Sequence, residues 1–522
     1  MFLLYNGRLD NCPPDCTALA IDHGEIIAIG SDAEILHLTT PGTESFNLRG
    51  RYVMPGLTDS HIHLELYGDS LSMVDCSTST RQECLSRVRE RSLKTPPDRW
   101  ILGHGWNQNL WSGVFGTASD LDAIAPLNPV FLTDTSLHSA WVNSKALEMA
   151  HIDSSTPDPA GGIIQLDERG NPTGILFEKA VDLIESIIPP VQPEERKQNL
   201  LKAQDRLIRY GVTAVHDFDR IPCFKALQEL DQEQQLFLRV FKGLPVEQLP
   251  EIIAAGLRTG FGSAHLRVGP IKLFADGALG PQTAAMLSPY SGDQTNFGKL
   301  LLTAEEIFET GKLAAASGLS LAVHAIGDRA TQEVLLGYAR LRDYEKANKL
   351  PALRHRVEHL QLLSPENLSL AAELQVYASM QPVHLYMDMP TADSHWGGRS
   401  RYAYAFSTLA SLNTPLIFGS DAPVETPNPF WGIHAAVTRC RQNSTTAWYP
   451  EERFNLRQAI NAYTLEPARQ SGLEGRSGEL KSGQAADLVV LDRDPFQVQP
   501  EELYSLSPVM VIVEGRRVFE SV

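Results

Sequence analysis

Two histidines, His61 and His63, stand two positions apart near the end of the stretch 52–64. Side chains two apart on an extended segment point to the same face, so both imidazoles can be aimed at one point while Ile62 packs behind them. Imidazole is a common ligand for zinc and other divalent ions. The pair is therefore a candidate part of a metal site, although two solvated loop histidines would have the same spacing.

Three further side chains that can bind metal end other apolar segments of the chain. His324 ends the segment 320–324, His359 ends 354–359, and Asp421 ends 415–421. Core positions are rarely His or Asp, so ordinary packing explains this pattern poorly. The sequence therefore predicts one metal site shared by these three residues and the histidine pair.

Lys272 lies inside the apolar segment 267–275, where an unpaired ammonium group would be costly to bury. A buried lysine can be neutralised by a lowered pKa or by chemical modification. If its amine takes up CO₂, it becomes a carbamate, which is an anionic oxygen ligand able to bridge two cations. In the alternative interpretation the stem packs in the core while the amine reaches Asp276 or solvent.

These residues need elements that bring them together, and the middle of the chain supplies a repeating pattern. Short apolar segments alternate there with amphipathic helical stretches such as 194–209, 304–317 and 329–346. The segments are 56–61, 212–217, 237–241, 267–275, 320–324, 354–359, 375–380 and 415–421. The pattern predicts an α/β fold, a (β/α)₈ TIM barrel, in which active sites lie at the carboxyl ends of the strands.

Both ends of the chain have the texture of short strands and turns, and neither is long enough to bury a sheet alone. We therefore expect a small composite β-sandwich from residues 1–52 and 466–522, and a barrel from residues 53–68 and 194–465. Residues 69–193 are too long for a barrel crossover and contain their own strand candidates. This segment is expected to be an inserted α+β subdomain over the barrel mouth.

Composition limits the partners of the protein. The 522 residues are 43% hydrophobic and 21% charged, which is typical of a soluble globular protein. The net charge of −18 argues against a nucleic-acid partner. No apolar stretch reaches the roughly 18–20 residues that cross a bilayer, so we expect no membrane span and a cytoplasmic location. The six cysteines show no disulfide framework, and the close pair Cys12 and Cys16 is interpreted as free thiols. A homo-oligomer is left open.

Taken in order, the motifs resemble those of the amidohydrolase superfamily, specifically amidohydrolase family 3 and its branch similar to N-substituted formamide deformylases. The resemblance covers essentially the whole chain. The motifs are PGLTDSHIHL at the first barrel strand, KLFADGALG at the fourth, HAIGD at the fifth, EHLQ at the sixth, ASMQPVH at the seventh and FGSDAPVE at the eighth.

The resemblance implies a role for each candidate ligand. His61 and His63 would bind the more buried metal, His324 and His359 the second, and carboxylated Lys272 would bridge the two ions. Asp421 would bind metal and also carry protons. One or two divalent ions, with zinc expected, would then be the cofactor.

The function expected from this set is hydrolysis of a non-peptide C–N bond in a small molecule, such as an amide, N-formyl or N-acyl bond. Metal-activated hydroxide would attack the carbonyl, and Asp421 would take the proton from the water and return it to the leaving nitrogen. The same barrel could instead serve a deaminase, an esterase or a cyclic amidase. A non-catalytic metal-binding regulatory protein is a further alternative, and the complete ligand set disfavours it.

Five residues are candidates for contact with a small-molecule substrate. Trp106 could wall an apolar group and His138 could donate to a carbonyl, with packing inside the inserted segment as the alternative. Gln381 and His384 follow the seventh strand, where helix capping or a loop hydrogen bond is the alternative. Asp276 follows a ligand strand and could instead orient its neighbours.

Overall fold

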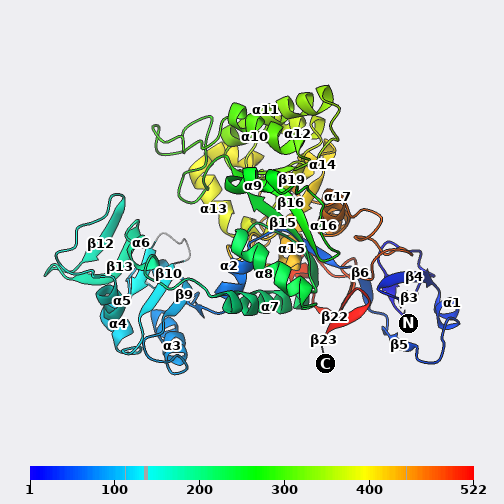
Figure 1. The fold of residues 1–522 in the computed structure, drawn as a ribbon, viewed down its shortest axis with the longest axis horizontal. Coiled ribbons are helices and arrows are strands. Elements are labelled where there is room, and N and C mark those ends of the chain that lie inside the picture. The colour runs from blue at the N-terminus through cyan, green and yellow to red at the C-terminus, as the bar shows by residue number, and fades with distance from the viewer. Residues whose placement is uncertain (112, 135–138, 443, 522) are drawn as a thin grey trace. The chain divides into compact units, whose positions relative to one another are not determined.

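The computed structural model describes every residue except 112, 135–138, 443 and 522. The described residues divide into two compact units. One unit is residues 1–65 together with 203–522, and the other is residues 66–202. Figure 1 labels many of the elements of both, and each unit is described by itself.

The first unit contains an eight-stranded sheet in which neighbouring strands are parallel and follow one another along the chain. This sheet, with helices around it, confirms the predicted (β/α)₈ barrel (Figure 1). Its strands are β7 (Leu57–Ile62), β14 (Val212–Asp217), β15 (Arg239–Pro245), β16 (Leu266–Phe274), β17 (Leu321–Ala325), β18 (Arg356–His359), β19 (Tyr377–Met380) and β20 (Leu416–Phe418).

The first and last strands meet at their carboxyl ends. The amide of Asp421 donates to the carbonyl oxygen of His61 at 2.7 Å, and the amide of His63 donates to that of Ala422 at 3.0 Å. Gly419 makes this approach possible, because a Cβ there would lie 2.4 Å from the backbone nitrogen of His61. Two candidate ligands from opposite ends of the barrel sequence are thereby joined through their own backbone.

Strand β15 extends further than its apolar segment predicts. The prediction ended the strand at residue 241, before Lys242 and Gly243, whereas β15 runs to Pro245. Lys242 is fully buried in the structure and its Nζ lies 2.7 Å from Asp217 Oδ2, so the charge is matched inside the barrel. A Cβ at Gly243 would lie 2.4 Å from the ring of Phe218. Lys242 therefore fits a buried strand because Asp217 matches its charge, and Gly243 fits because the ring of Phe218 leaves no room for a side chain.

Helices connect the barrel strands and bury one apolar face each. α11, for example, begins after β17 and buries Val334, Tyr338 and Leu341, which lie three or four residues apart and share one face. α10 lies beside α11 (Figure 1) and begins with a capping box between Thr303 and Glu306. The α-helices that follow residue 220 are α8 (Ile221–Gln232), α9 (Leu249–Ala254), α10 (Ala304–Ala316), α11 (Asp328–Ala347), α12 (Leu368–Glu373), α13 (Leu385–Trp396), α14 (Phe406–Ser411), α15 (Pro429–Thr438), α16 (Leu456–Ala462) and α17 (Leu465–Gln470), and the long helix α7 (Pro193–Arg209) precedes β14.

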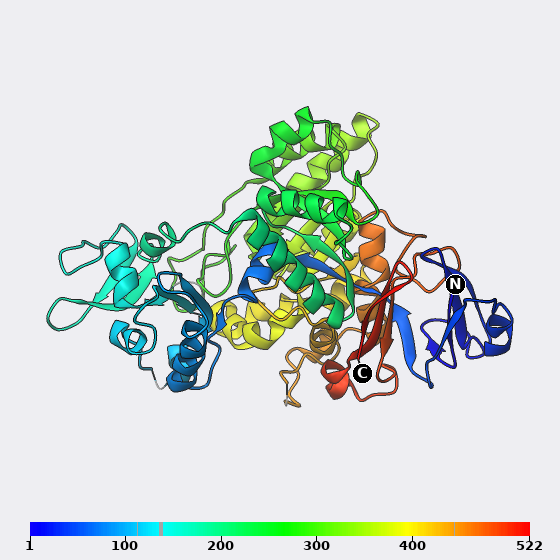
Figure 2. The same ribbon diagram turned by 60° about the horizontal axis from the view of Figure 1, so that its bottom comes forward.

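Two further sheets of the same unit come from the chain ends: a four-stranded sheet of amino-terminal strands, and a five-stranded sheet with strands from both ends. β6 pairs antiparallel with β21, so strands from the two ends share one sheet (Figure 2). Apolar side chains of both sheets form one core, including Leu19, Ile21, Val490 and Ile512. The predicted composite β-sandwich is therefore confirmed. Its strands are β1 (Phe2–Tyr5), β2 (Arg8–Leu9), β3 (Ala18–Asp22), β4 (Glu25–Gly30), β5 (Glu44–Asn47), β6 (Tyr52–Pro55), β21 (Leu488–Leu491), β22 (Pro508–Val513) and β23 (Arg516–Glu520).

The second unit contains a six-stranded mixed sheet with helices and two apolar clusters. Residues of β10 alternate between the clusters, because Val130 and Leu132 join one and Phe131 joins the other. The strands are β8 (Val74–Asp75), β9 (Ile101–Trp106), β10 (Val130–Asp134), β11 (Ser139–Val142), β12 (Gly162–Leu166) and β13 (Pro172–Glu178), and the helices include α3 (Arg81–Ser92), α4 (Ala118–Asp122), α5 (Ser144–Met149) and α6 (Asp182–Glu185). Across the described parts of both units, none of the helices is both long and apolar enough to pass through a bilayer.

Candidate active site

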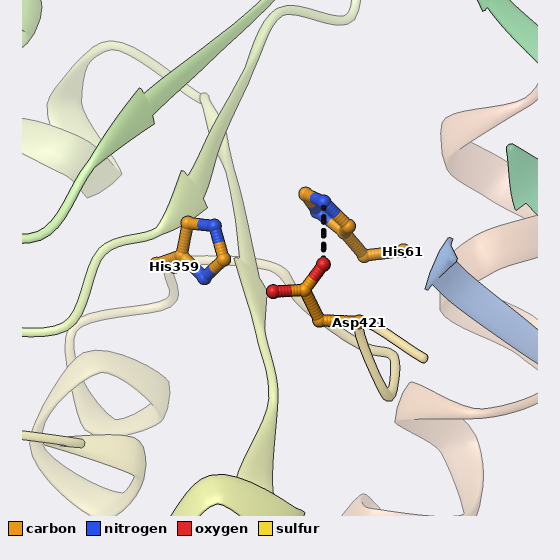
Figure 3. Close-up of side chains that lie close together, drawn as sticks. All are labelled: His61, His359 and Asp421. Atoms are coloured by element: carbon orange, nitrogen blue, oxygen red, sulfur yellow. Dashed lines mark ion pairs between the residues drawn. The ribbon is translucent and has the colours of Figure 1, made fainter. Parts of the chain in front are cut away.

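Three candidate ligands meet at the carboxyl ends of the barrel strands. His61 belongs to β7, His359 ends β18, and Asp421 follows β20. Each offers one ligand atom, and these atoms all lie within 4.8 Å of one another. Figure 3 shows the two imidazoles and the carboxylate facing one another. The arrangement therefore has the donor types and the spacing of a metal site.

Asp421 also lies beside the second histidine of the pair. Its Oδ1 atom lies 3.5 Å from Nε2 of His61 and 3.5 Å from Nε2 of His63. The two Nε2 atoms therefore face one carboxylate oxygen, as the His-x-His spacing predicts for an extended segment.

Backbone conformation helps to aim two of these side chains. His359 has a φ of 68° and Asp421 a φ of 61°, both in the left-handed region that residues other than glycine rarely adopt. In a regular strand His359 would point away from the face that carries Glu358. The left-handed turn instead leaves its ring centre 5.1 Å from that of His61 and 4.5 Å from that of His324. Such conformations cluster at functional sites.

A buried carboxylate fixes His61 from behind. Glu358 Oε2 lies 2.5 Å from Nδ1 of His61, and both residues are almost fully buried. Arg356 donates from Nε to Oε1 of the same carboxylate at 2.5 Å and from Nη2 to Oε2 at 2.9 Å. Burial alone would raise the pKa of Glu358, but the Arg356 charge lowers it overall. An ionised Glu358 accepts the Nδ1 proton and leaves the lone pair of Nε2 directed at Asp421.

His63 has a corresponding partner in Asp219, whose Oδ1 lies 3.3 Å from Nδ1. Burial would lower the pKa of His63, but the hydrogen bond and charge of Asp219 and the charge of Asp421 raise it overall. Behind this pair, Lys242 forms its buried ion pair with Asp217 and also donates to the carbonyl oxygen of Asp219. Lys242, which belongs to β15, thus contacts both Asp217 at the end of β14 and Asp219 just after it.

Lys272 is only 5% exposed, so its amine does not reach solvent. Its Nζ lies 4.7 Å from the ring centre of Phe218 and 5.0 Å from that of Phe274. Burial lowers the pKa of Lys272 to about 8, although the nearby charges of Glu358 and Asp421 act in the opposite direction. In mildly alkaline solution a large fraction of the protein molecules therefore carries Lys272 as a neutral amine, which is the form that reacts with CO₂.

His324 lies next to the three-ligand group but outside it. Its Nε2 lies 2.9 Å from the carbonyl oxygen of Gly277 and 3.5 Å from Oδ1 of Asp276. Burial, followed by the charge of Lys272, lowers the pKa of His324 to about 4. The imidazole is therefore neutral at physiological pH, with its Nε2 directed at a carbonyl group in this structure.

The protonation states of the central histidines suit a divalent ion. Burial, and then the charge of Lys272, lowers the pKa of His61 well below its usual value. Burial, and then the neighbouring His324, does the same for His359. Neutral imidazole is the form that binds metal, and a carboxylate beside it adds the charge that attracts a cation. The residues present therefore fit the divalent metal that the donor set implies.

The inserted unit contains two of the expected substrate contacts. Trp106 is fully buried in an apolar cluster of that unit, and its indole N–H donates to the carbonyl oxygen of Leu132 at 2.8 Å. No part of its ring is exposed to a ligand here, so packing describes its environment. His138 lies outside the described residues.

The other three expected contacts lie in the barrel unit. The carboxylate of Asp276 accepts backbone hydrogen bonds at 2.8–3.0 Å from Ala285, Ile326 and Gly327, which is the geometry of an orienting residue. The Gln381 amide donates to the carbonyl oxygen of Ser379 at 3.3 Å. His384 lies with its ring centre 6.3 Å from that of His359, at the edge of the ligand group.

Sequence reasoning missed the supports of the ligands, above all Glu358, Arg356, Asp219 and Lys242. A signal was present, since Arg356 and Glu358 lie two apart in a strand next to apolar Val357. Alternation places both charges on one face, and charges on a buried face need partners there. The identity of those partners follows only from the folded structure.

Comparison with known proteins agrees with this geometry. The model of the amidohydrolase family matches residues 44–519. The protein LONG AFTER FAR-RED 3 of Arabidopsis thaliana is 32% identical, with 99% of this chain and 91% of the relative aligned. The N-substituted formamide deformylase of Arthrobacter pascens is 27% identical over 99% of this chain and 97% of its own length.

A solved structure extends the likeness to three dimensions. An uncharacterized metal-dependent hydrolase from Pyrococcus furiosus superposes with a TM-score of 0.78 at 31% identity, over 95% of this chain and all of that one. The family match, the parallel barrel and the cluster of His61, His359 and Asp421 lead to one conclusion. The chain belongs to the amidohydrolase family and is a metal-dependent hydrolase.

Proposed function

We propose that this protein hydrolyses a non-peptide C–N bond in a small amide, with N-formyl and N-acyl amines as the substrate class. The family supplies the hydrolytic chemistry, and the deformylase from Arthrobacter pascens is a relative along almost the whole chain. The expected small-molecule substrate and a cytoplasmic location are part of the same proposal.

Zinc is the proposed metal, and Lys272 the proposed bridging ligand after carboxylation. Several neutral imidazoles with one carboxylate are a donor set that zinc accepts readily. The environment of Lys272 supports its carboxylation, because the amine is buried and its pKa is lowered to about 8. A carbamate at this position would bring a negative charge close to His61 and Asp421.

A divalent ion bound here would polarise the substrate carbonyl and lower the pKa of a water molecule. Asp421 accepts the proton of the attacking water at Oδ1 and later delivers it to the leaving nitrogen. Glu358 and Asp219 hold His61 and His63 in place through their Nδ1 atoms. Burial of the ligands keeps bulk water away from the developing charge and strengthens these interactions.

One observation carries the proposal: Oδ1 of Asp421 lies 3.5 Å from Nε2 of both His61 and His63. A carboxylate so close to the ligand nitrogens can serve both the metal and the attacking water. A structural salt bridge would not need an imidazole such as His61, whose pKa is lowered well below its usual value, beside that carboxylate oxygen.

The test is a metal analysis of the purified protein followed by a turnover screen of N-formyl and N-acyl amines, with esters, cyclic amides and aminopurines in the same panel. Turnover of the first group, abolished in Asp421→Asn and in His61→Ala, is the expected result. Faster turnover of another group would assign the alternative chemistry. Full activity in both variants would refute the site.

A further inference from the structure

A large cavity lies in the unit of residues 1–65 and 203–522, apart from the candidate active site. Its volume is about 1060 Å³. Arg239 and Arg267, at the beginning of β15 and β16, line it, together with the turns at Gly24 and Glu514 and with residues between 473 and 485. The amino ends of the barrel strands therefore face this cavity, whereas the metal ligands lie at the carboxyl ends.

The charge of this cavity is opposite to that of the whole protein. Four arginines and two glutamates line it, although the chain carries a net charge of −18. The arginines are Arg239, Arg267, Arg476 and Arg516, and the glutamates are Glu25 and Glu514. An excess of arginine inside a concave site of an acidic protein attracts anions.

The carboxylates near the cavity are mostly engaged. Arg239 forms a close pair with Asp487, with Nε 2.5 Å from Oδ2. Glu514 is shared between Nη2 of Arg239 at 3.3 Å and Nε2 of His265 at 3.1 Å. Within the described parts of the chain, no carboxylate lies at ion-pair distance from Arg267, Arg476 or Arg516.

Arg267 is held in place without being neutralised. Its Nε donates to the carbonyl oxygen of Gly260 at 2.9 Å and its Nη1 to that of Ser471 at 3.0 Å. Burial, and then the charge of Arg476, lowers the pKa of the Arg267 guanidinium, whereas the charge of Glu474, which is paired with Arg354, acts in the opposite direction. Two like charges that lie near each other across a cavity, one of them fixed by carbonyl groups, favour an anion between them.

We propose that this cavity is a second binding site, in which Arg267, Arg476 and Arg516 bind a small molecule with at least two negative charges. Phosphate and carboxylate groups share the planar, bidentate contacts that guanidinium groups make. The cavity is large enough for a metabolite-sized ligand. The site is separate from the hydrolytic centre and does not depend on the substrate proposed there.

The test is isothermal titration of the full-length, metal-loaded protein with pyrophosphate in one arm and succinate in the other, at low ionic strength. Saturable binding of pyrophosphate or of succinate is expected. The ligand with the higher affinity shows whether the site prefers phosphate or carboxylate groups. Arg476→Gln is expected to weaken binding about tenfold or more, since it removes a positive charge and its charge-assisted hydrogen bond to the anion. Arg476 is exposed, so this change should leave folding intact.

Two further variants separate a built site from general charge attraction. Arg441→Gln removes an exposed arginine that does not line the cavity, and its binding should equal that of the unmodified protein. Glu25→Gln removes an opposing charge from the lining and should tighten binding about twofold to fivefold. Absence of saturable binding in both arms, or an equal loss in Arg441→Gln and Arg476→Gln, would overturn the proposal.

Discussion

Glu358 Oε2 lies 2.5 Å from Nδ1 of His61, although the two residues are 297 positions apart in the chain. This contact sets the tautomer and the direction of an imidazole that faces Asp421. Glu358→Gln should therefore lower metal affinity by about 10-fold to 100-fold, the range typical of such outer partners. Competition with a chelator of known affinity measures the change.

Glu366→Gln provides the matched control for this change, because Glu366 is an exposed glutamate close in the sequence. Its metal affinity should equal that of the unmodified protein. Unchanged affinity in Glu358→Gln would mean that His61 is aimed by packing alone.

Lys272 should make metal uptake depend on both pH and bicarbonate. Its pKa is lowered to about 8, so protons compete with CO₂ for the amine below that pH and the neutral amine prevails above it. Metal uptake by chelator-treated protein should therefore gain more from added bicarbonate at pH 8.5 than at pH 6.5. Elemental analysis after dialysis measures the amount of metal bound.

Lys272→Ala tests the same carbamate by chemical rescue. This variant should lose metal at every pH and should recover part of it when short carboxylates are added, because they can occupy the space of the carbamate oxygens. Metal content that equals that of the unmodified protein, without any added carboxylate, would exclude Lys272 as a ligand.

Phe274 keeps the Lys272 amine in an apolar environment, with its ring centre 5.0 Å from Nζ. Phe274→Ala should admit water and raise the pKa of Lys272 from about 8 toward its ordinary value, because the burial that lowers it is reduced. The midpoint of bicarbonate-dependent metal uptake should then move to higher pH. Phe261→Ala, at a phenylalanine that is 66% exposed, should leave the midpoint in place. A common midpoint in all three proteins would contradict this account of the lysine.

The buried pair of Lys242 and Asp217 should matter for stability, since Nζ and Oδ2 lie 2.7 Å apart and both side chains are fully buried. Lys242→Met keeps the stem but leaves a carboxylate without a counter-charge, which should cost about 3–5 kcal/mol in the free energy of unfolding. Denaturant titration followed by fluorescence measures the loss.

Two companion variants complete this experiment. Adding Asp217→Asn to Lys242→Met should recover part of the lost stability, because no unpaired charge remains. Lys481→Met, at a lysine that is 62% exposed and pairs with Glu479, should change stability by less than about 1 kcal/mol. A loss in Lys242→Met as small as that in Lys481→Met would show that water reaches Asp217.

The sequence by itself determined the barrel and the positions of the candidate metal ligands along the chain. Apolar segments of strand length alternate with amphipathic helices, and His324, His359 and Asp421 each stand at the end of one segment. Strand and helix periods are local properties, so they can be read without knowledge of the fold. The ends of parallel strands meet at one rim, which is why His61 and Asp421, 360 positions apart, could be predicted to lie close together.

Only the tertiary structure decided what surrounds those ligands. Local patterns do not specify which distant residue a buried charge will meet, so the contacts of Glu358 with His61 and of Lys242 with Asp217 could not be predicted. The left-handed backbone at His359 and the full burial of Trp106 depend in the same way on neighbours far along the chain. Long-range packing chooses among side-chain environments that the local sequence leaves equally open.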